Sequence, residues 1–331
     1  RVLTSIDVWS GILPAADAHV APSSYGAALV LLYACVRFGD RAYCIYLKTR
    51  TSGRRIRGRL MSQDWVHVDE EDEYMVDYLF DLNGYIVLKG AIGSDDLSEM
   101  NQWVDAHWEY VEGKRRDYDK DSGAWIGNVE THTYSGPDGC NFQNIIEGGP
   151  VFRRLINYPA WIDHCRRWIN PTNGVSIHEN LLNVRGQGGY IGIHGGGALP
   201  LCYLTFRQEN TGEWMVGQVN VIGALTDVGP GDGATTLIPG SHKSAMRHPK
   251  LSGQVYRSDD VAGNQVGMKE MYLEAGDALR FADTMTHGSA ARTNGGHRRI
   301  TLYRYSPRFL RSRFHYVPSE NLLANLDEEQ R

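Results

Sequence analysis

Apolar positions recur at helical spacing in the first part of the chain. Over residues 64–118 the pattern predicts helices with an acidic start, interrupted by one strand at residues 85–90 (YIVLKG). One of these helices is predicted to begin at Ser94, a residue type suited to an N-cap. A further helix is predicted over residues 151–169, broken near Pro159.

The apolar pattern changes after about Ser176, where short β-like runs alternate with glycine turns. The runs are VSIHENLLNVR, GGYIGIH, MVGQVNVIGALTDV, ATTLIPGSH, GDALRFAD and RRITLYRYS. Short strands separated by turn signals predict a β-sandwich or barrel. Residues 115–149 are polar and rich in Gly, Asn and Asp, which predicts a loop. The fold class is therefore mainly β with flanking α-helices, with a helical buttress over about 61–170 and a β-core over about 176–308.

Composition narrows the class of protein. The 331 residues are 42% hydrophobic and 22% charged, which is typical of a soluble globular protein. A formal net charge of −5 gives no reason to expect a nucleic-acid partner. No apolar run reaches the about 18 residues of a membrane span. Five scattered cysteines without a paired pattern favour a reducing cytoplasm. The oligomeric state is not encoded in any of these features.

Charge is unevenly distributed along the chain. Residues 1–60 hold nine Lys or Arg and three Asp or Glu, a balance of +6, so the remainder carries −5 − 6 = −11. A basic stretch, Lys48–Leu60, ends just before Met61, and the chain opens on Arg1. We therefore expect residues 61–331 to form one domain and residues 1–60 to lie outside it, as an extension that is either an artefact of an over-long reading frame or a targeting or basic arm.

Two of the twelve histidines stand at the ends of strand-like runs. Because side chains alternate along a strand, Tyr190, Gly192 and His194 share one face. His287 follows the apolar run in LRFADTMTHGS. Taken alone, each of these two histidines is more often a structural residue than a metal ligand.

An arginine near the C-terminal end changes this balance. In HRRITLYRYS, strand alternation places Arg298 on the same face as Ile300 and Leu302, which predicts that its guanidinium points into the barrel. An unpaired buried charge is very costly, so Arg298 needs an anionic partner. That partner could be the carboxylate of a bound co-substrate or an internal Asp or Glu.

The glycine-rich segment Gly229–Ser244 superficially suggests a phosphate loop. It lacks the GxxxxGK[ST] order and precedes a strand where a phosphate loop precedes a helix. We interpret Gly231-Asp232-Gly233 as a tight hairpin turn. His242, in the next turn, is expected to be exposed.

Three segments together resemble the phytanoyl-CoA dioxygenase family: ALTDVGPGDGATTLIPGSHKS, GDALRFADTMTHGSA and RRITLYRY. The resemblance covers about residues 70–310 and is sharpest from about 180 to 305. Its most specific parts are IPGSHK and the eleven-residue spacing from His287 to Arg298. Members of this family are non-haem iron(II), 2-oxoglutarate-dependent oxygenases built on a double-stranded β-helix, or jelly roll, so the resemblance implies that fold.

The resemblance also implies roles for four residues. His194 and His287, 93 residues apart, match the two metal histidines. Arg298 matches the residue that pairs with the 5-carboxylate of 2-oxoglutarate, and Ser289 matches a position that touches the co-substrate. Two imidazoles and one carboxylate would leave iron(II) three positions, two for the keto acid and one for O2. The implied reaction is oxidation of a small organic substrate, probed by the release of succinate.

One position departs from the family pattern. The family has His-x-Asp at the first metal histidine, whereas this chain has Gly196 at the acid position. Chloride could fill the vacancy, as in related iron halogenases. Another carboxylate, Asp283 or Asp232, could replace the missing ligand. Water could also fill the place, or the fold could have lost iron and serve as a binding module for a small acid or a protein.

The substrate is weakly constrained by the sequence. Relatives by this resemblance oxidise acyl-CoA thioesters, alkaloids, amino acids and other small molecules, and no basic cluster suggests a CoA site. Arg185 could hold a substrate carboxylate or be structural. Four aromatic residues could line a pocket or simply pack: Trp125, Tyr134, Phe142 and Trp214. A cupin-like metal isomerase or hydrolase would share the β-architecture but has no need of Arg298.

Overall fold

The structure is a computed structural model. It describes residues 8–9, 29–38, 41–50, 73–113, 124–132, 138–169, 174–195, 205–207, 214–244, 246–251, 257–310 and 317–331. The chain divides into two compact units, residues 1–62 and residues 63–331. The first unit contains an antiparallel sheet in the order β1-β3-β2, formed by β1 (Val8–Trp9), β2 (Leu29–Phe38) and β3 (Arg41–Arg50). That residues 1–60 lie outside the native domain stays a prediction.

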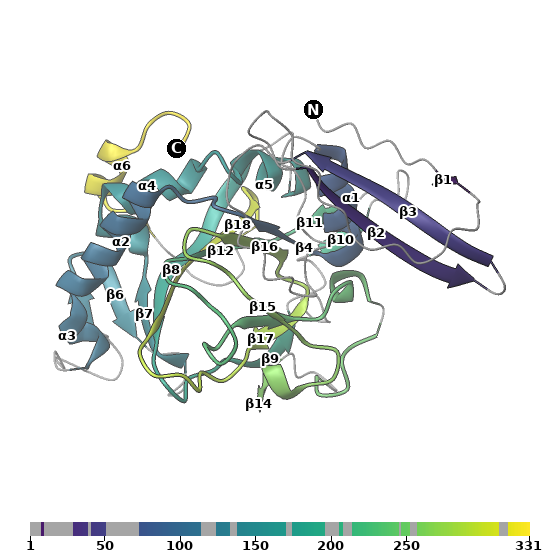
Figure 1. Cartoon of the computed structure of the whole chain (residues 1–331). Coiled ribbons are helices and arrows are strands. Elements are labelled where there is room, and N and C mark those ends of the chain that lie inside the picture. Colours follow the sequence, from purple (N-terminus) through teal and green to yellow (C-terminus); the bar gives the residue numbers. More distant parts are fainter. Residues whose placement is uncertain are drawn as a thin grey trace. The chain divides into compact units, whose positions relative to one another are not determined.

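Two antiparallel sheets form the second unit (Figure 1). The larger has eight strands in the order β4-β16-β12-β18-β8-β7-β6-β5: β4 (Tyr85–Leu88), β5 (Ala124–Ile126), β6 (Val129–His132), β7 (Cys140–Gln143), β8 (Val175–Arg185), β12 (Val219–Ala224), β16 (Ala278–Ala282) and β18 (Arg298–Pro307). The smaller has five strands in the order β14-β9-β17-β13-β15: β9 (Gly192–Gly195), β13 (Thr235–Leu237), β14 (Arg257–Val261), β15 (Lys269–Met271) and β17 (Thr286–Ser289). A separate pair joins β10 (Thr205–Arg207) to β11 (Trp214–Val216).

The chain passes back and forth between the two sheets. β8 lies in the larger sheet, β9 in the smaller, β12 in the larger, β13 and β15 in the smaller, β16 in the larger, β17 in the smaller and β18 in the larger. This alternation is that of a double-stranded β-helix, a jelly roll of two antiparallel sheets. The predicted fold class, mainly β with flanking helices, is confirmed.

Helices cover the outer face of the eight-stranded sheet (Figure 1). They are α1 (Glu73–Asn83), α2 (Ser94–Ala106), α3 (Trp108–Val111), α4 (Pro150–Arg154), α5 (Ile162–Ile169) and α6 (Glu320–Asn325). Alternate residues of β18 bind them: Arg299 pairs with Asp105 of α2 at 2.6 Å, and the Tyr303 hydroxyl donates to the Phe152 carbonyl of α4 at 2.7 Å. The outer face of this sheet is therefore buried as well: Thr301, Tyr303 and Tyr305 of β18 are each 1% exposed.

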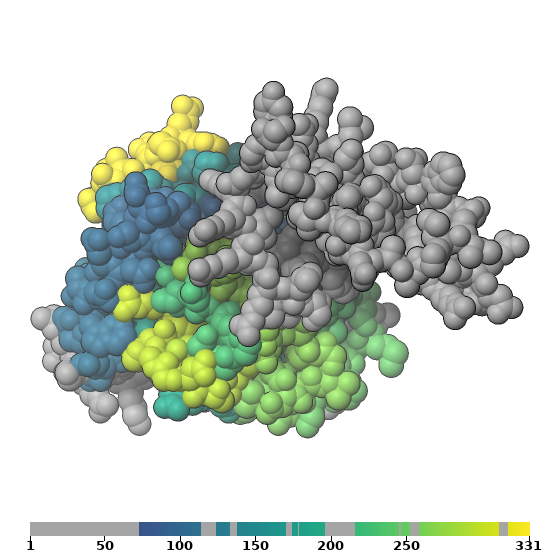
Figure 2. Space-filling model, viewed as in Figure 1, coloured from purple at the N-terminus to yellow at the C-terminus, as the bar shows by residue number. Residues whose placement is uncertain are grey.

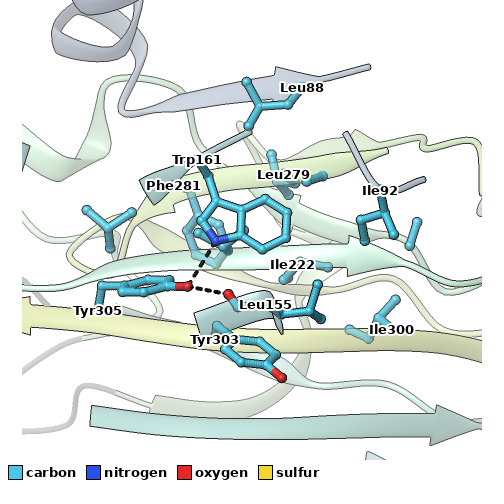
Figure 3. Close-up of a cluster of buried hydrophobic side chains, with 14 of the residues drawn as sticks. Leu88, Ile92, Leu155, Trp161, Ile222, Leu279, Phe281, Ile300, Tyr303 and Tyr305 are labelled. Carbon is cyan, nitrogen blue, oxygen red and sulfur yellow. Dashed lines mark hydrogen bonds between the residues drawn. The ribbon is translucent and has the colours of Figure 1, made fainter. Parts of the chain in front are cut away.

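Polar groups on this buried face find partners within the core (Figure 3). The Tyr305 hydroxyl accepts a hydrogen bond from the Trp161 indole at 2.9 Å and donates to the Leu155 carbonyl at 2.9 Å. Both aromatic side chains are 1% exposed. Large amphipathic residues can be buried in this way because their polar atoms are satisfied.

The predicted helix over residues 151–169 is confirmed with its break, since α4 and α5 are separated around Pro159. The N-cap prediction is wrong: the N-cap of α2 is Gly93, with no side-chain cap, and Ser94 is the first helical residue.

The loop predicted over residues 115–149 is also wrong in part, because β5, β6 and β7 lie within it. The reason is that polar residues there satisfy one another inside the protein. Asn141 of β7 lies opposite Asn183 of β8, and their side chains are hydrogen-bonded at 2.9 Å. A buried strand can therefore have a polar sequence when its partners supply the hydrogen bonds.

The C-terminal residues lie at the surface of the second unit, in yellow in Figure 2. Glu329 holds this segment against the helical layer by accepting from Asn157 at 3.1 Å and Arg166 at 2.8 Å. Across the described ranges, no helix combines the length and the apolar character needed to cross a membrane.

Candidate active site

The two candidate metal histidines lie side by side. β9 and β17 are adjacent antiparallel strands, and their register places His194 directly opposite His287. Directly paired residues project from the same face of a sheet. The two imidazole centroids are 4.0 Å apart, with an interplanar angle of 52°. The fold thus brings together two residues that are 93 positions apart in the sequence.

Each imidazole is oriented by its own backbone. Nδ1 of His194 lies 2.9 Å from the carbonyl oxygen of Gly192, and Nδ1 of His287 lies 2.7 Å from that of Met285. A carbonyl oxygen only accepts, so Nδ1 must carry the hydrogen in both rings. The lone pair of each neutral imidazole is then on Nε2. This is the tautomer in which a histidine with a backbone partner binds a metal.

Arg298 begins β18 and is 2% exposed, as strand alternation predicted. Its Nη1 donates to the Gly233 carbonyl at 2.5 Å, and its Nη2 donates to Oδ1 of Asn183 at 3.0 Å. Its Nε has no hydrogen-bond partner. The internal salt bridge that the sequence left open is not present among the described residues, so the guanidinium there has only neutral acceptors.

A second buried arginine lies beside the first. Arg185 of β8 is directly opposite Arg298 of β18, and it pairs with Asp138 at 3.2 Å. Burial lowers the pKa of Arg185 to about 10, an effect that Asp138 opposes. Burial also lowers the pKa of Arg298 well below its ordinary value, and the neighbouring Arg185 lowers it further.

The charges around Arg298 do not balance. Arg185 has Asp138, and Arg292 has Asp232 at 3.0 Å, but Arg298 has no carboxylate within the described part of the chain. The cluster is therefore one negative charge short. One carboxylate group from a ligand would neutralise it.

Ser289 lies on the same face of β17 as His287, two residues further along. Its Oγ accepts a hydrogen bond from Nη1 of Arg185 at 2.8 Å and another from the backbone N–H of Ile191 at 2.7 Å. A hydroxyl oxygen has two acceptor lone pairs, so both are used. The Ser289 hydroxyl is thereby left to act as a donor, which suits an anionic ligand.

The carboxylates considered as replacements for the missing ligand are both bound by other side chains. Asp283 accepts from Nδ2 of Asn220 at 2.9 Å, and Asp232 is held by Arg292. Within the described ranges, no three His, Cys, Asp or Glu side chains lie together as a group that could hold a metal ion. Gly196 falls outside the described residues.

Two other predictions about single residues are corrected. His242 was expected to be exposed, but it is 7% exposed, and its Nε2 lies 3.0 Å from the Asp81 carbonyl at the end of α1. Its ring packs on Gly84, where an added Cβ would lie 2.4 Å from Nδ1. The IPGSHK segment therefore anchors the end of α1.

The Gly231–Gly233 segment does turn tightly, with Gly231 at φ 81°. It is not a hairpin, however, because β12 and β13 lie in different sheets. This turn supplies the Gly233 carbonyl that binds Arg298.

The aromatic residues proposed as pocket walls are divided by the structure. Phe142 is fully buried and packs edge-on against Trp103, with centroids 5.2 Å apart, so it belongs to the core. Trp125 is 50% exposed. Tyr134 and the side chain of Trp214 lie outside the described residues.

Sequence reasoning missed three groups that shape the site. Asp138 pairs with Arg185, while Asn183 and the Gly233 carbonyl bind Arg298. A signal was present in VSIHENLLNVR, where alternation places Asn183 and Arg185 on one face, as polar residues pointing into the barrel.

Comparisons with known proteins show which family and which folds this chain resembles. Residues 203–300 match the family model described as Phytanoyl-CoA dioxygenase (PhyH). A curated relative, Dioxygenase cdmD of Talaromyces verruculosus, is 30% identical over 115 residues, which is 35% of this chain. The matched stretch spans only 31% of that relative's length.

Solved structures share the fold at low sequence identity. HygX from Streptomyces hygroscopicus, with nickel, 2-oxoglutarate and hygromycin B bound, superposes with a TM-score of 0.55 at 19% identity, covering 71% of this chain and 87% of HygX. The epimerase SnoN, in complex with Fe3+, alpha ketoglutarate and nogalamycin RO, gives a TM-score of 0.50 at 15% identity, covering 72% of this chain and 84% of SnoN.

Residues 203–300 are thus similar to the phytanoyl-CoA dioxygenase family, and the chain shares its fold with HygX. The resemblance drawn from the sequence motifs is confirmed.

Proposed function

We propose that the second unit is an iron(II)- and 2-oxoglutarate-dependent oxygenase that uses O2 to oxidise a small organic molecule. The observation that carries this proposal is the buried Arg298, which has no carboxylate partner in the described chain and lies in the same barrel as the paired His194 and His287. A cupin-like isomerase or hydrolase would have no use for such an arginine.

The residues present fit the cofactor and the co-substrate. His194 and His287 would hold iron(II) through Nε2, since Nδ1 of each ring is bound to a carbonyl. Arg298 would bind the distal carboxylate of 2-oxoglutarate through Nε and its amino groups, as a guanidinium binds a carboxylate best when both bonds form. Ser289 would donate its hydroxyl hydrogen to the same carboxylate.

Iron(II), when bound, supplies the oxidative decarboxylation of 2-oxoglutarate by O2 to succinate and CO2, with the second oxygen atom passing to a C–H bond of the substrate. The protein would orient the co-substrate and exclude water from the site. Arg185 and the Ile191 N–H fix Ser289, and the burial of Arg298 excludes water from the carboxylate that it would bind.

Gly196 stands where the family pattern has the carboxylate ligand, so the proposed site has two histidine ligands from the protein. A hydroxylase with a two-histidine site is the reading we favour, with water or the co-substrate completing the iron. Chloride in the vacant position would make the protein a halogenase. Within the described residues, no three His, Cys, Asp or Glu side chains form a group that could hold a metal ion, which is compatible with both.

Similar proteins support a small-molecule substrate. Structures of HygX contain iron in one case and nickel with 2-oxoglutarate in another, and hygromycin B is bound in a third. A cytoplasmic location stays a prediction from the scattered cysteines.

Succinate release tests the proposed function. Purified full-length protein with iron(II), 2-oxoglutarate and air is expected to release succinate, even without its substrate, at a slow uncoupled rate. His287→Ala and Arg298→Ala are expected to abolish this release, and His107→Ala, at the C-cap of α2 in the helical layer, serves as the control. Succinate that forms equally in all four proteins would contradict the proposal. Adding the eventual substrate with and without chloride then separates hydroxylation from halogenation.

A further inference from the structure

A second set of polar side chains lines the inner face of the eight-stranded sheet, apart from the Arg298 cluster. We call it the polar band; its members are Glu179, Gln218, Asn220, Asp283 and Arg304. Asn220 lies directly opposite Arg304, and Arg304 lies directly opposite Glu179, so these three cross neighbouring strands on one face. Gln218 and Asp283 join them through Asn220.

The polar band lies at the histidine end of the barrel. Phe281 is directly opposite Asn220, and the Phe281 ring is 5.1 Å from the His287 ring. Arg304 is six residues from Arg298 along β18, a separation of about 20 Å at about 3.3 Å per residue. A co-substrate held by Arg298 would therefore reach the metal from one end, and the polar band would meet a substrate at the other.

Apolar residues separate the two polar regions. On the same inner face, Leu279, Ile222, Leu302 and Leu181 form the next row of directly opposed residues. Burying polar groups is unfavourable unless they are hydrogen-bonded, so an apolar row is the ordinary filling of a barrel. The polar band departs from that filling at the one level that adjoins the histidines.

The hydrogen bonds within the polar band leave one carbonyl oxygen, Oε1 of Gln218, without a partner. Arg304 donates to Glu179 at 2.5 Å, Asn220 donates to Asp283 at 2.9 Å, and Gln218 donates to Oδ1 of Asn220 at 3.3 Å. Gln218, Asn220 and Asp283 are 0% exposed. Oε1 of Gln218 is buried without a hydrogen-bond partner, although a buried carbonyl oxygen almost always has one.

The polar band mainly offers oxygen atoms that accept hydrogen bonds. It contains two carboxylates, Glu179 and Asp283, against one guanidinium, Arg304, and Oε1 of Gln218, which has no hydrogen-bond partner, is also an acceptor. Such a surface complements hydroxyl and ammonium groups, which donate hydrogen bonds and bring positive charge. An alkyl chain would cover these buried polar groups without giving them the hydrogen bonds that they need, which is unfavourable.

We propose that the polar band is the substrate-recognition subsite and that the substrate is a small polyhydroxylated molecule carrying a protonated amine. The proposal rests on the proposed function, because it places the substrate beside the metal histidines. Gln218 accepts from a hydroxyl or ammonium group, and Glu179 and Asp283 supply the negative potential. A fatty-acyl chain is excluded as the group bound at this level.

Binding to the metal-free full-length protein tests this proposal without any turnover. The probes are glucosamine and kanamycin as amine-bearing polyols, their N-acetylated forms as neutral matches, and octanol as an apolar probe, each titrated by calorimetry. At least one amine-bearing probe is expected to bind, with its N-acetylated form at least about tenfold weaker, the scale on which one hydrogen bond or ion pair acts. Octanol is expected not to bind.

Variants assign the binding to the polar band. Gln218→Met removes the unpartnered oxygen at nearly constant shape, so affinity is expected to fall about tenfold while folding stability stays the same or rises. Glu179→Gln is expected to reduce the preference for the amine over its N-acetylated form. Leu302→Met, in the apolar row of the same sheet face, is the matched control and is expected to bind as the parent does.

Two results would overturn the proposal: no amine-bearing probe binds, or Gln218→Met and Leu302→Met bind the probe equally well. The proposed function fails separately. If iron(II) and 2-oxoglutarate do not bind but the amine-bearing probe binds as described, the subsite stands and the oxygenase reaction does not. If succinate is released but octanol binds in place of the amines, the reaction stands and the substrate class is wrong.

Discussion

Replacing Arg298 by methionine is expected to separate stability from co-substrate binding. In the free protein the guanidinium is 2% exposed and bonded only to the Gly233 carbonyl and the Asn183 amide oxygen. Its burial as a cation is unfavourable, and the neighbouring Arg185 increases the cost. Replacing buried charges with apolar side chains of similar volume is often neutral or stabilising, so we expect Arg298→Met to leave the free energy of unfolding unchanged or to raise it by about 1–3 kcal/mol.

The same substitution is expected to weaken 2-oxoglutarate binding strongly. Losing one partner of a buried, hydrogen-bonded charge pair costs about 2–5 kcal/mol, which is a fall in affinity of about 30-fold to several thousand-fold. At a concentration of about 100 times the Kd of the parent, 2-oxoglutarate should stabilise the parent protein by about 2.7 kcal/mol and the variant by less than about 1 kcal/mol. Urea unfolding with and without 2-oxoglutarate and a metal measures both quantities at once.

Arg299→Met is the matched control, because Arg299 is the next residue but points to the outer face, where it binds Asp105 and Asn101. Its co-substrate affinity should equal that of the parent. The reasoning is refuted if Arg298→Met strongly destabilises the free protein, or if it binds 2-oxoglutarate as tightly as Arg299→Met does.

Three further predictions concern the anchor of α1 and the co-substrate site. Burial lowers the pKa of His242 to about 4. The stability that the neutral ring contributes is therefore complete above about pH 6.5 and is lost as the pH falls toward 4, by up to about 3 kcal/mol. The free energies of unfolding of the parent and of His242→Gln, measured between pH 4 and 7, should show different pH dependences in that window. Gly84→Ala, where the new Cβ meets the His242 ring, should destabilise the fold by about 3 kcal/mol. Gly90→Ala is the control, because Gly90 also has a positive φ, 58°, but has nothing within 4 Å of an added Cβ; it should cost only about 1–2 kcal/mol. Thermal denaturation measures both values. Ser289→Ala should raise the KM for 2-oxoglutarate about tenfold and leave kcat nearly unchanged in the succinate assay, and an unchanged KM would mean that its hydroxyl does not donate to the co-substrate.

Strand alternation was sufficient to predict where the charged side chain of Arg298 points. The position of Arg298 among Ile300 and Leu302 placed it inside the barrel, and the structure confirms its burial. Alternation depends only on local backbone geometry, so a single strand contains the information. The pairing of His194 with His287 has a different source, because β9 and β17 become neighbours only when the sheets assemble.

The partners of these residues could not be predicted from local pattern. Asp138 lies in a polar, glycine-rich segment that suggested a loop, and only the pairing of β7 with β8 brings it to Arg185. His242 likewise follows a turn that suggested exposure, and its burial depends on the end of α1. In both cases a distant element supplies the hydrogen-bond partner that makes burial of a polar residue possible.

Anaerobic absorption spectroscopy tests the central claim most directly. When iron(II) and 2-oxoglutarate are added together to the oxygen-free protein, we expect a weak visible charge-transfer band that saturates at one iron per chain, and no band when either is omitted. The band should be lost in His194→Ala, His287→Ala and Arg298→Ala. If the parent develops no band under these conditions, or if all three variants keep it, the paired imidazoles and the buried arginine do not form the site proposed for them.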